Sequence, residues 1–279
     1  MPAYEFPEGL ARILRTLDAP QAAGVECVVH DDSTTDAAQD LVQGHRACLS
    51  GRVRYRRNRP ALGAVRNWNS LISAARGNYV ILMHHDEFPD SPLFFTQLRT
   101  QLERLNQPDI LILRCMLPSV GGRWRLHMPP WLQRTLLRTA PSHLLRHNTI
   151  GPTACLVLRR ERLQAFDERL QWLVDVEWSH RLLTTPGTRW ELADVSVLSS
   201  QKPGGSITAS LAGRTTAIAR IESKMVQARL GRLPALRLQA PETLGERLLA
   251  RLEHAIWLGV RAAVRLSGLL ARQPRQPVP

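Results

Sequence analysis

The order of apolar and amphipathic stretches predicts an α/β protein in which helices cover both faces of a mainly parallel sheet. The first observation is a repeated alternation of short Val-, Ile- and Leu-rich runs with longer stretches of helical periodicity. The second is the apolar run at residues 79–83, which suits a strand buried on both faces. The third is that titratable residues follow this run directly. With 279 residues, the chain suits one α/β domain, alone or with an appendage.

The predicted elements follow one another in a regular order. A helix with a proline at its start opens the chain at residues 7–17, and Gly77 ends the helix that precedes the run at 79–83. Sequence patterns predict further strands at residues 25–30, 53–56, 109–115, 153–158 and 190–198. They predict further helices at residues 37–42, 61–75, 91–105 and 175–183. Alternation of this kind favours parallel pairing, because each helix carries the chain back across the sheet.

Two later regions are less regular. Residues 117–147 are basic and contain several glycines, prolines and tryptophans, so they form either a mobile loop over an active site or an ordinary long excursion. Residues 243–272 give the longest helix signal, with arginines gathered on one face. Such a face suits an anionic membrane surface, and a helix packed on its own domain is the alternative. We therefore expect a sheet domain at residues 1–208 and an amphipathic helical extension at 209–279 with a disordered tail.

The composition limits the choice of partners and compartment. A formal charge of +13 suggests nucleic acid or an anionic membrane surface as a partner. Yet Lys202 and Lys224 are the only lysines, and an arginine excess in a chain rich in Ala and Leu is consistent with coding bias, so no nucleic acid is expected. The 4 cysteines form no CxxC pair, and neither a signal-peptide pattern nor an apolar run of about 18 residues is present. These observations predict a cytoplasmic protein, free or peripheral on the cytosolic face of a membrane.

Titratable groups gather where two of the predicted strands end. Residues 84–87, which read His-His-Asp-Glu, follow the run at 79–83. Residues 31–36, which begin with two aspartates, follow the run at 25–30. In open α/β sheets, ligands bind beyond the carboxyl ends of the strands, so both segments are candidate binding sites. A polar strand-to-helix loop and ordinary helix capping are the alternatives.

Four segments, taken in order, resemble glycosyltransferase family 2, an inverting group with the GT-A fold. The first is VVHDDSTTD at residues 28–36, and the third is residues 84–87, where the family has a DxD-type motif. The second is the series Gly63, Arg66, Asn67, Ala75, Gly77 and Tyr79. The fourth, which resembles the family's acceptor-site segment, consists of Phe166, Asp167, Glu168, Asp175 and Arg181. Each motif alone is weak, but their common order is fairly specific, and the resemblance covers residues 1–208.

The resemblance implies transfer of a sugar, with inversion, from a nucleotide-diphosphate sugar to a hydroxyl of a glycan or lipid-linked acceptor. It makes Asp175 the general base, with Glu177 as the nearest alternative. It implies a divalent cation, Mn²⁺ or Mg²⁺, held by Asp86 with help from His84 or Glu87. Substrate contacts are expected from Pro2, Tyr4, Asp31, Asp32, Arg66, Asn67, His84, Glu177 and Lys202. The implied pathway is the synthesis of bacterial cell-surface polysaccharide.

The sequence departs from the family pattern at three places. His84 stands where the DxD-type motif has its first aspartate, and Lys202 stands where a late loop of the family has a histidine. Residues 1–4 resemble the family's Pro-x-Tyr turn without the strand that precedes it, so we expect a late start assignment or a truncation. A catalytically impaired GT-A-like domain is therefore one alternative function. An arginine-rich nucleic-acid-binding protein is the other.

Overall fold

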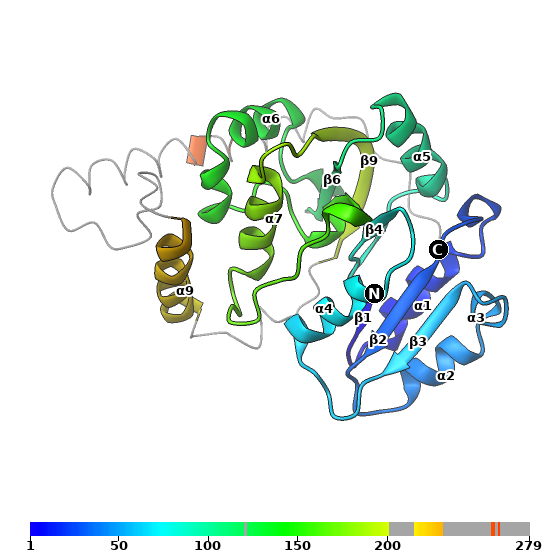
Figure 1. The fold of residues 1–279 in the computed structure, drawn as a ribbon. Coiled ribbons are helices and arrows are strands. Elements are labelled where there is room, and N and C mark those ends of the chain that lie inside the picture. Colours follow the sequence, from blue (N-terminus) through cyan, green and yellow to red (C-terminus); the bar gives the residue numbers. More distant parts are fainter. Residues whose placement is uncertain (120–121, 201–214, 231–257, 260–261, 263–279) are drawn as a thin grey trace, which may run out of the picture.

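The computed structural model describes residues 1–119, 122–200, 215–230, 258–259 and 262 (Figure 1). Lys202, most of the helix predicted at residues 243–272 and the tail after it lie outside the described residues. Within the described part of the chain, no helix is long and apolar enough to cross a membrane. The expected division at residue 208 stays a prediction.

The first layer is a parallel three-stranded sheet with the strand order β1-β2-β3. Its strands are β1 (Pro2–Ala3), β2 (Cys27–Asp31) and β3 (Val53–Arg57). The helices around it are α1 (Pro7–Thr16), α2 (Ala37–Gln43), α3 (Arg46–Leu49) and α4 (Ala64–Ala74). Helix α4 packs on β1 and β2, whereas α2 and α3 pack on β3 (Figure 1). This half of the molecule follows the predicted strand–helix alternation closely.

The second sheet has six strands with the order β4-β8-β6-β9-β5, and β7 pairs with β6. These strands are β4 (Tyr79–Ile81), β5 (Glu87–Pro89), β6 (Ile110–Pro118), β7 (Trp124–Leu126), β8 (Leu156–Arg159) and β9 (Trp190–Ser199). The helices of this half are α5 (Phe94–Arg104), α6 (Pro130–Thr139) and α7 (Val174–Thr184). In the described part of this sheet, β6 and β9 pair in parallel, and the other neighbouring strands pair antiparallel. The α/β class is confirmed, and this second sheet is mixed.

Two predictions about local structure need correction. The strand at residues 79–83 was expected to be buried on both faces, but β4 ends at Ile81, is half-buried throughout and lies at one end of the strand order. The chain leaves the strand there because Leu82 bonds instead to Thr153, whose hydroxyl donates to its carbonyl oxygen at 3.1 Å. Residues 117–147 are not one irregular loop, since they contain β7, α6 and a 3-10 turn at Pro141–Leu145.

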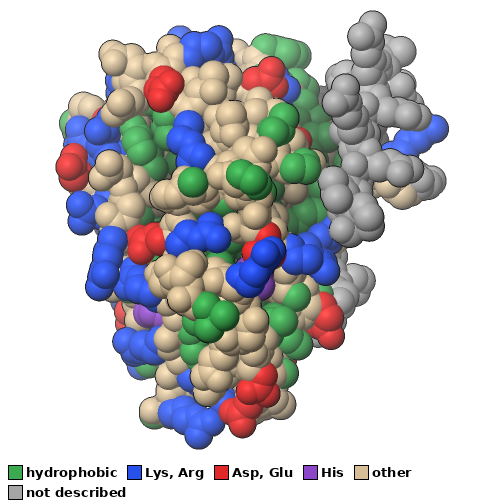
Figure 2. All heavy atoms as spheres, turned by 90° about the vertical axis from the view of Figure 1, so that its right-hand side faces the viewer, with side chains coloured by type: hydrophobic (Ala, Val, Ile, Leu, Met, Phe, Trp, Pro, Cys, Tyr) green, Lys and Arg blue, Asp and Glu red, His purple; other side chains and the backbone are tan. Residues whose placement is uncertain are grey.

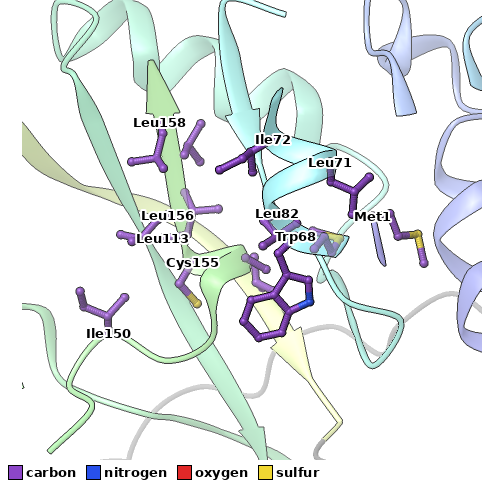
Figure 3. Close-up of a cluster of buried hydrophobic side chains, with 14 of the residues drawn as sticks. Met1, Trp68, Leu71, Ile72, Leu82, Leu113, Ile150, Cys155, Leu156 and Leu158 are labelled. Carbon is purple, nitrogen blue, oxygen red and sulfur yellow. The ribbon is translucent and has the colours of Figure 1, made fainter. Parts of the chain in front are cut away.

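One continuous hydrophobic core joins the two sheets. Trp68, Leu71 and Ile72 of α4 lie opposite Leu156 and Leu158 of β8 (Figure 3). Burying a side chain of this size contributes about 1.5–3 kcal/mol, so this contact stabilises the junction between the halves. A small cavity of about 80 Å³ remains between β2 and β4. The buried amino group of Met1 borders it and donates to the carbonyl oxygen of Val28 at 2.6 Å, and burial lowers the pKa of this amine to about 6.

Candidate active site

A tight turn between β4 and β5 holds His84 against Glu87. The backbone N–H of His84 donates to Glu87 Oε2 at 2.9 Å, and His84 Nδ1 lies 3.3 Å from both carboxylate oxygens. Thr153 Oγ1 lies 3.3 Å from the same ring nitrogen. Burial alone would lower the pKa of His84, but the charge and hydrogen bond of Glu87 outweigh it and raise that pKa. The charges of His84 and Glu87 therefore largely offset each other.

Asp86 projects from the same turn and keeps part of its surface exposed. Its backbone carbonyl accepts hydrogen bonds from the N–H and the hydroxyl of Ser200, both at 2.9 Å, which fasten the turn to the end of β9. Among the described residues, no group of three or more His, Cys, Asp or Glu side chains could hold a metal ion. A cation at Asp86 would need phosphate oxygens and water to complete its shell, which is the usual arrangement for Mg²⁺.

His84 offers such a cation one further nitrogen. Its Nε2 is buried and makes no hydrogen bond, while its ring packs edge-on against Trp68 with 4.9 Å between ring centroids. An imidazole nitrogen without a hydrogen-bond partner suits Mn²⁺ as a ligand. The chemistry of this donor set therefore fits a divalent cation held jointly with a diphosphate.

Asp175 is the second residue of α7 and faces the same group of side chains. Part of the residue remains accessible, but protein atoms surround its carboxylate closely. This burial raises the pKa of Asp175 to about 6; the charge of Glu87 acts in the same direction, and His84 opposes it. Asn148 Nδ2 donates to Asp175 Oδ2 at 3.1 Å. The structure thus brings together a titratable carboxylate and the turn that carries Asp86.

Asn148 organises the turn from which it reaches Asp175. Its Oδ1 accepts from the backbone N–H groups of Ile150 and Gly151 at 3.1 and 2.8 Å, and its Nδ2 also donates to the Gly151 carbonyl at 2.8 Å. Gly151 has a φ of +110°, and a Cβ there would lie 2.8 Å from Cys115 Cβ, so the turn requires glycine. Sequence reasoning missed Asn148, which directly follows the stretch without clear periodicity at residues 117–147.

Glu177, the alternative base, has a different environment. It is only 2% exposed, and Arg181 donates to it from Nε at 3.0 Å and from Nη2 at 3.1 Å. Arg229 of the later helix α9 (Thr215–Leu230) donates to Glu177 Oε1 at 3.0 Å as well. Two guanidinium groups occupy the oxygens of this carboxylate, which leaves it less accessible to a substrate hydroxyl. The geometry favours Asp175 over Glu177 as a base.

The segment before α7 is fixed by Asn69, another residue that sequence reasoning missed. Asn69 Oδ1 accepts from the N–H of Phe166 at 2.7 Å, and Asn69 Nδ2 donates to the Phe166 carbonyl and to Glu168, both at 3.1 Å. Arg66, whose side chain is largely exposed, forms an ion pair with Glu168 at 3.4 Å. The Phe166 ring stacks on Trp178 with 4.2 Å between centroids. Helix α4 therefore fixes the position of the predicted acceptor segment, and Phe166 of that segment packs against Trp178 of α7.

The aspartates predicted to contact a nucleoside are buried at the end of β2. Asp31 accepts from Tyr55 Oη at 2.7 Å and from the Ser33 N–H at 2.9 Å. Burial, helped by the bond to Asp31, raises the pKa of Tyr55. Tyr4, which is 55% exposed, follows β1, where Ala3 pairs with Asp31. Tyr4 thus lies at the same end of the sheet as the acidic pair.

Asp32 joins β2 to the loop before α4. Its Oδ1 accepts from Asn58 Nδ2 at 2.8 Å and from the Leu62 N–H at 3.1 Å, and its Oδ2 accepts from the Gly63 N–H at 2.9 Å. Asn67 is 2% exposed and donates to the His30 carbonyl at 3.1 Å. These contacts give Asp32 and Asn67 structural roles. Substrate contacts of Pro2, Tyr4, Asp31, Asp32, Arg66 and Asn67 stay predictions.

Solved structures with the GT-A fold resemble this protein. Crystal structures of S. aureus TarS 1–349 include one in complex with UDP-GlcNAc, which aligns with a TM-score of 0.59 and 16% identity over 81% of this chain and 65% of that one. The mannosyltransferase PcManGT from Pyrobaculum calidifontis, in complex with GDP-Man and Mn²⁺, aligns with a TM-score of 0.50 and 16% identity over 95% and 81% of the two chains. GalNAc-T7 with UDP, GalNAc and Mn²⁺ gives a TM-score of 0.52 at 15% identity over 72% and 43%. The protein has the GT-A fold of nucleotide-sugar glycosyltransferases.

The family assignment rests on the sequence. The pattern described as Glycosyl transferase family 2 matches residues 1–166, which is more than half of the chain, and the protein belongs to that family. No curated protein matched the sequence. The chain spans 58% of TarS 1–349 in one crystal structure and 65% in another. Fold and family are thereby established, and both agree with the resemblance noted in the sequence.

Replacing Asp32 tests whether its hydrogen bonds stabilise the fold, which a residue that only binds substrate would not do. Asp32→Ala removes the acceptor of one buried donor, Asn58 Nδ2, and of the two partly buried N–H groups of Leu62 and Gly63, so we expect the free energy of unfolding to fall by about 1–3 kcal/mol. Urea denaturation followed by circular dichroism measures this change. Asp36→Ala is the matched control, because its side chain is 65% exposed and a surface ion pair contributes about 1 kcal/mol or less. Equal stability of Asp32→Ala and the parent protein would contradict the structural role.

Proposed function

We propose that this protein is an inverting glycosyltransferase in which Asp175 is the general base. The single observation that carries the proposal is the contrast between two neighbouring carboxylates. Burial raises the pKa of Asp175 to about 6 and its side-chain partner is a neutral amide, whereas Glu177 is paired with two arginines. A base whose pKa lies near the working pH combines the ionised form with a useful proton affinity.

The proposed reaction is a single displacement. Asp175 takes the proton from the acceptor hydroxyl while that oxygen attacks the anomeric carbon of the donor sugar. The bond between the sugar and the diphosphate breaks, and the nucleoside diphosphate leaves with the bonding electron pair. Because attack comes from the face opposite the leaving group, the configuration at the anomeric carbon inverts. The chain's part in this step is to orient Asp175 through Asn148 and to limit its contact with water.

Asp86, with His84 Nε2, is the proposed anchor of a divalent cation, Mn²⁺ or Mg²⁺. When bound, such a cation would neutralise negative charge on the leaving diphosphate. Two structural neighbours, the mannosyltransferase PcManGT and GalNAc-T7, are complexes with Mn²⁺ and GDP-Man or UDP, which supports this proposal. Asp86 is partly exposed, and its carboxylate makes no hydrogen bond or ion pair with the residues that the structure describes. It is therefore open to a ligand.

The proposed donor is a nucleotide-diphosphate sugar, and the acceptor is a hydroxyl of a glycan or of a lipid-linked glycan. Tyr4 and Pro2, beside the acidic pair at the end of β2, are the proposed contacts of the nucleoside. Synthesis of bacterial cell-surface polysaccharide is the proposed pathway, and it rests on the family. A contact with anionic lipid through residues 243–272 belongs to the same proposal, and those residues lie almost wholly outside the described chain.

One observation favours the impaired domain as a second candidate. His84 replaces an acidic metal ligand and is already compensated by Glu87, so metal affinity could be too low for transfer. The nucleic-acid alternative receives less support. Basic side chains on the face in Figure 2 are scattered among acidic ones, and Arg57, Arg134 and Arg181 form ion pairs within the protein.

Asp175→Asn tests the proposed function. Asparagine keeps the shape of the side chain but cannot accept the proton, so we expect transfer to fall about 10²- to 10⁴-fold with donor binding unchanged. Transfer assays with a panel of nucleotide sugars, and calorimetry with UDP or GDP plus Mn²⁺, measure the two properties. Asp86→Ala, in contrast, should lose the Mn²⁺-dependent binding of UDP or GDP that calorimetry measures. An Asp175→Asn variant that keeps transfer within a few-fold of the parent protein would exclude Asp175 as the base.

The pH dependence of transfer follows from the pKa of Asp175. Because the carboxyl holds a proton below its pKa, transfer should fall as the pH decreases through about 6. In Asn148→Asp, a carboxylate oxygen replaces the amide donor 3.1 Å from Asp175, while the other oxygen still accepts from the turn. Like charges raise the pKa, so the midpoint should move upward by about one pH unit or more. A midpoint that stays in place would show that another group, such as His84, limits the reaction.

A further inference from the structure

Helix α9 supplies a buried carboxylate to the segment in front of α7. Glu222 is 3% exposed and accepts three backbone hydrogen bonds, from the N–H groups of Gln171 at 2.5 Å, Trp172 at 3.0 Å and Leu173 at 2.8 Å. These contacts span about fifty residues of sequence. They join two parts of the chain that both lie beyond the family match at residues 1–166.

These bonds fix the residues that lead into α7. Leu173 occupies the cap position, and its own side chain makes no capping hydrogen bond. A carboxylate near a helix N-terminus also interacts favourably with the helix dipole. Glu222, from a different helix, therefore holds the cap residue and the two residues before it.

Arg229, two turns further along α9, makes a second connection. Its Nη1 donates to Glu177 Oε1 at 3.0 Å, and its Nη2 bonds to Asp167. Arg169 and then Arg229 hold the pKa of Asp167 well below its usual range, so this carboxylate is fully ionised. Arg229 thus bridges α7 and the segment that Asn69 fixes. Val226, between the two polar residues, is 1% exposed and belongs to the hydrophobic core.

We propose that Glu222 and Arg229 are positioning residues for the catalytic base, which they hold by fixing the first turn of α7. The inference rests on the proposed function of Asp175, which follows Leu173 by two residues. Without Glu222, the N–H groups of Gln171, Trp172 and Leu173 lose their acceptor, and the residues that lead into α7 can shift. A displacement of about 1 Å at a reacting group can cost about 10²-fold in rate, so the effect appears in catalysis.

Glu222→Gln tests this role, because glutamine keeps the shape but replaces one accepting oxygen with a donor. We expect kcat to fall about 10- to 100-fold, while the donor KM stays within about twofold because Asp86 lies on another segment. Hydrogen exchange of the backbone amides of residues 171–173, followed by mass spectrometry, should be faster than in the parent protein. The matched control Lys224→Gln, at an exposed position of α9, should change neither property.

Arg229 gives an independent variant should Glu222→Gln fail to fold. Its side chain is 34% exposed, so Arg229→Gln should fold, lower kcat about tenfold and be partly rescued by Arg229→Lys, which keeps the charge. Arg220→Gln on the exposed side of α9 is its control. Folded Glu222 and Arg229 variants with the kcat of the parent protein would overturn the positioning role while leaving the proposed function intact. A parent protein without transfer activity would instead remove the proposed function, and the catalytic role of α9 with it.

Discussion

The candidate site depends on how the protein offsets the cost of burying several carboxylates. Each buried negative charge must be compensated or must take up a proton. Glu87 is compensated by His84, and Glu177 by Arg181 and Arg229. Asp175 has Asn148 as its side-chain partner, and a neutral amide compensates less than a cation. It is therefore the carboxylate of this group with a pKa raised to about 6.

The fold brings these groups together from distant parts of the chain. The turn after β4 carries His84, Asp86 and Glu87, and it is fastened to the end of β9 through Ser200. Helix α4 contacts both the end of β2, where Asn67 bonds to the His30 carbonyl, and the acceptor segment, where Asn69 bonds to Phe166. Helix α9 contacts the segment before α7 through Glu222 and α7 itself through Arg229. Most of these connections are hydrogen bonds from side chains to backbone groups, which fix main-chain geometry around the site.

Much of the first half of the fold could be predicted from the sequence. The helix expected at residues 7–17 is α1 (Pro7–Thr16), because proline and apolar periodicity are local signals. The order of motifs gave the family, which the match at residues 1–166 confirms. Strand β4 was misjudged because an apolar run does not reveal whether a strand is central or at an edge. Asn69, Asn148 and Glu222 were missed because each bonds to a residue far away in sequence, and no local pattern indicates such bonds.

The central claim, that Asp175 ionises near pH 6 in the folded protein, can be measured without substrate. The measurement is an NMR titration of the aspartate side-chain carboxyl carbons in ¹³C-labelled protein, with the Asp175 signal assigned by its loss in Asp175→Asn. The account predicts a midpoint at about 6, two pH units above the ordinary range of an aspartate. A midpoint near 4 would mean that water or another donor stabilises the ionised Asp175 carboxylate. It would contradict the claim that burial raises the pKa of Asp175 into the range of a general base.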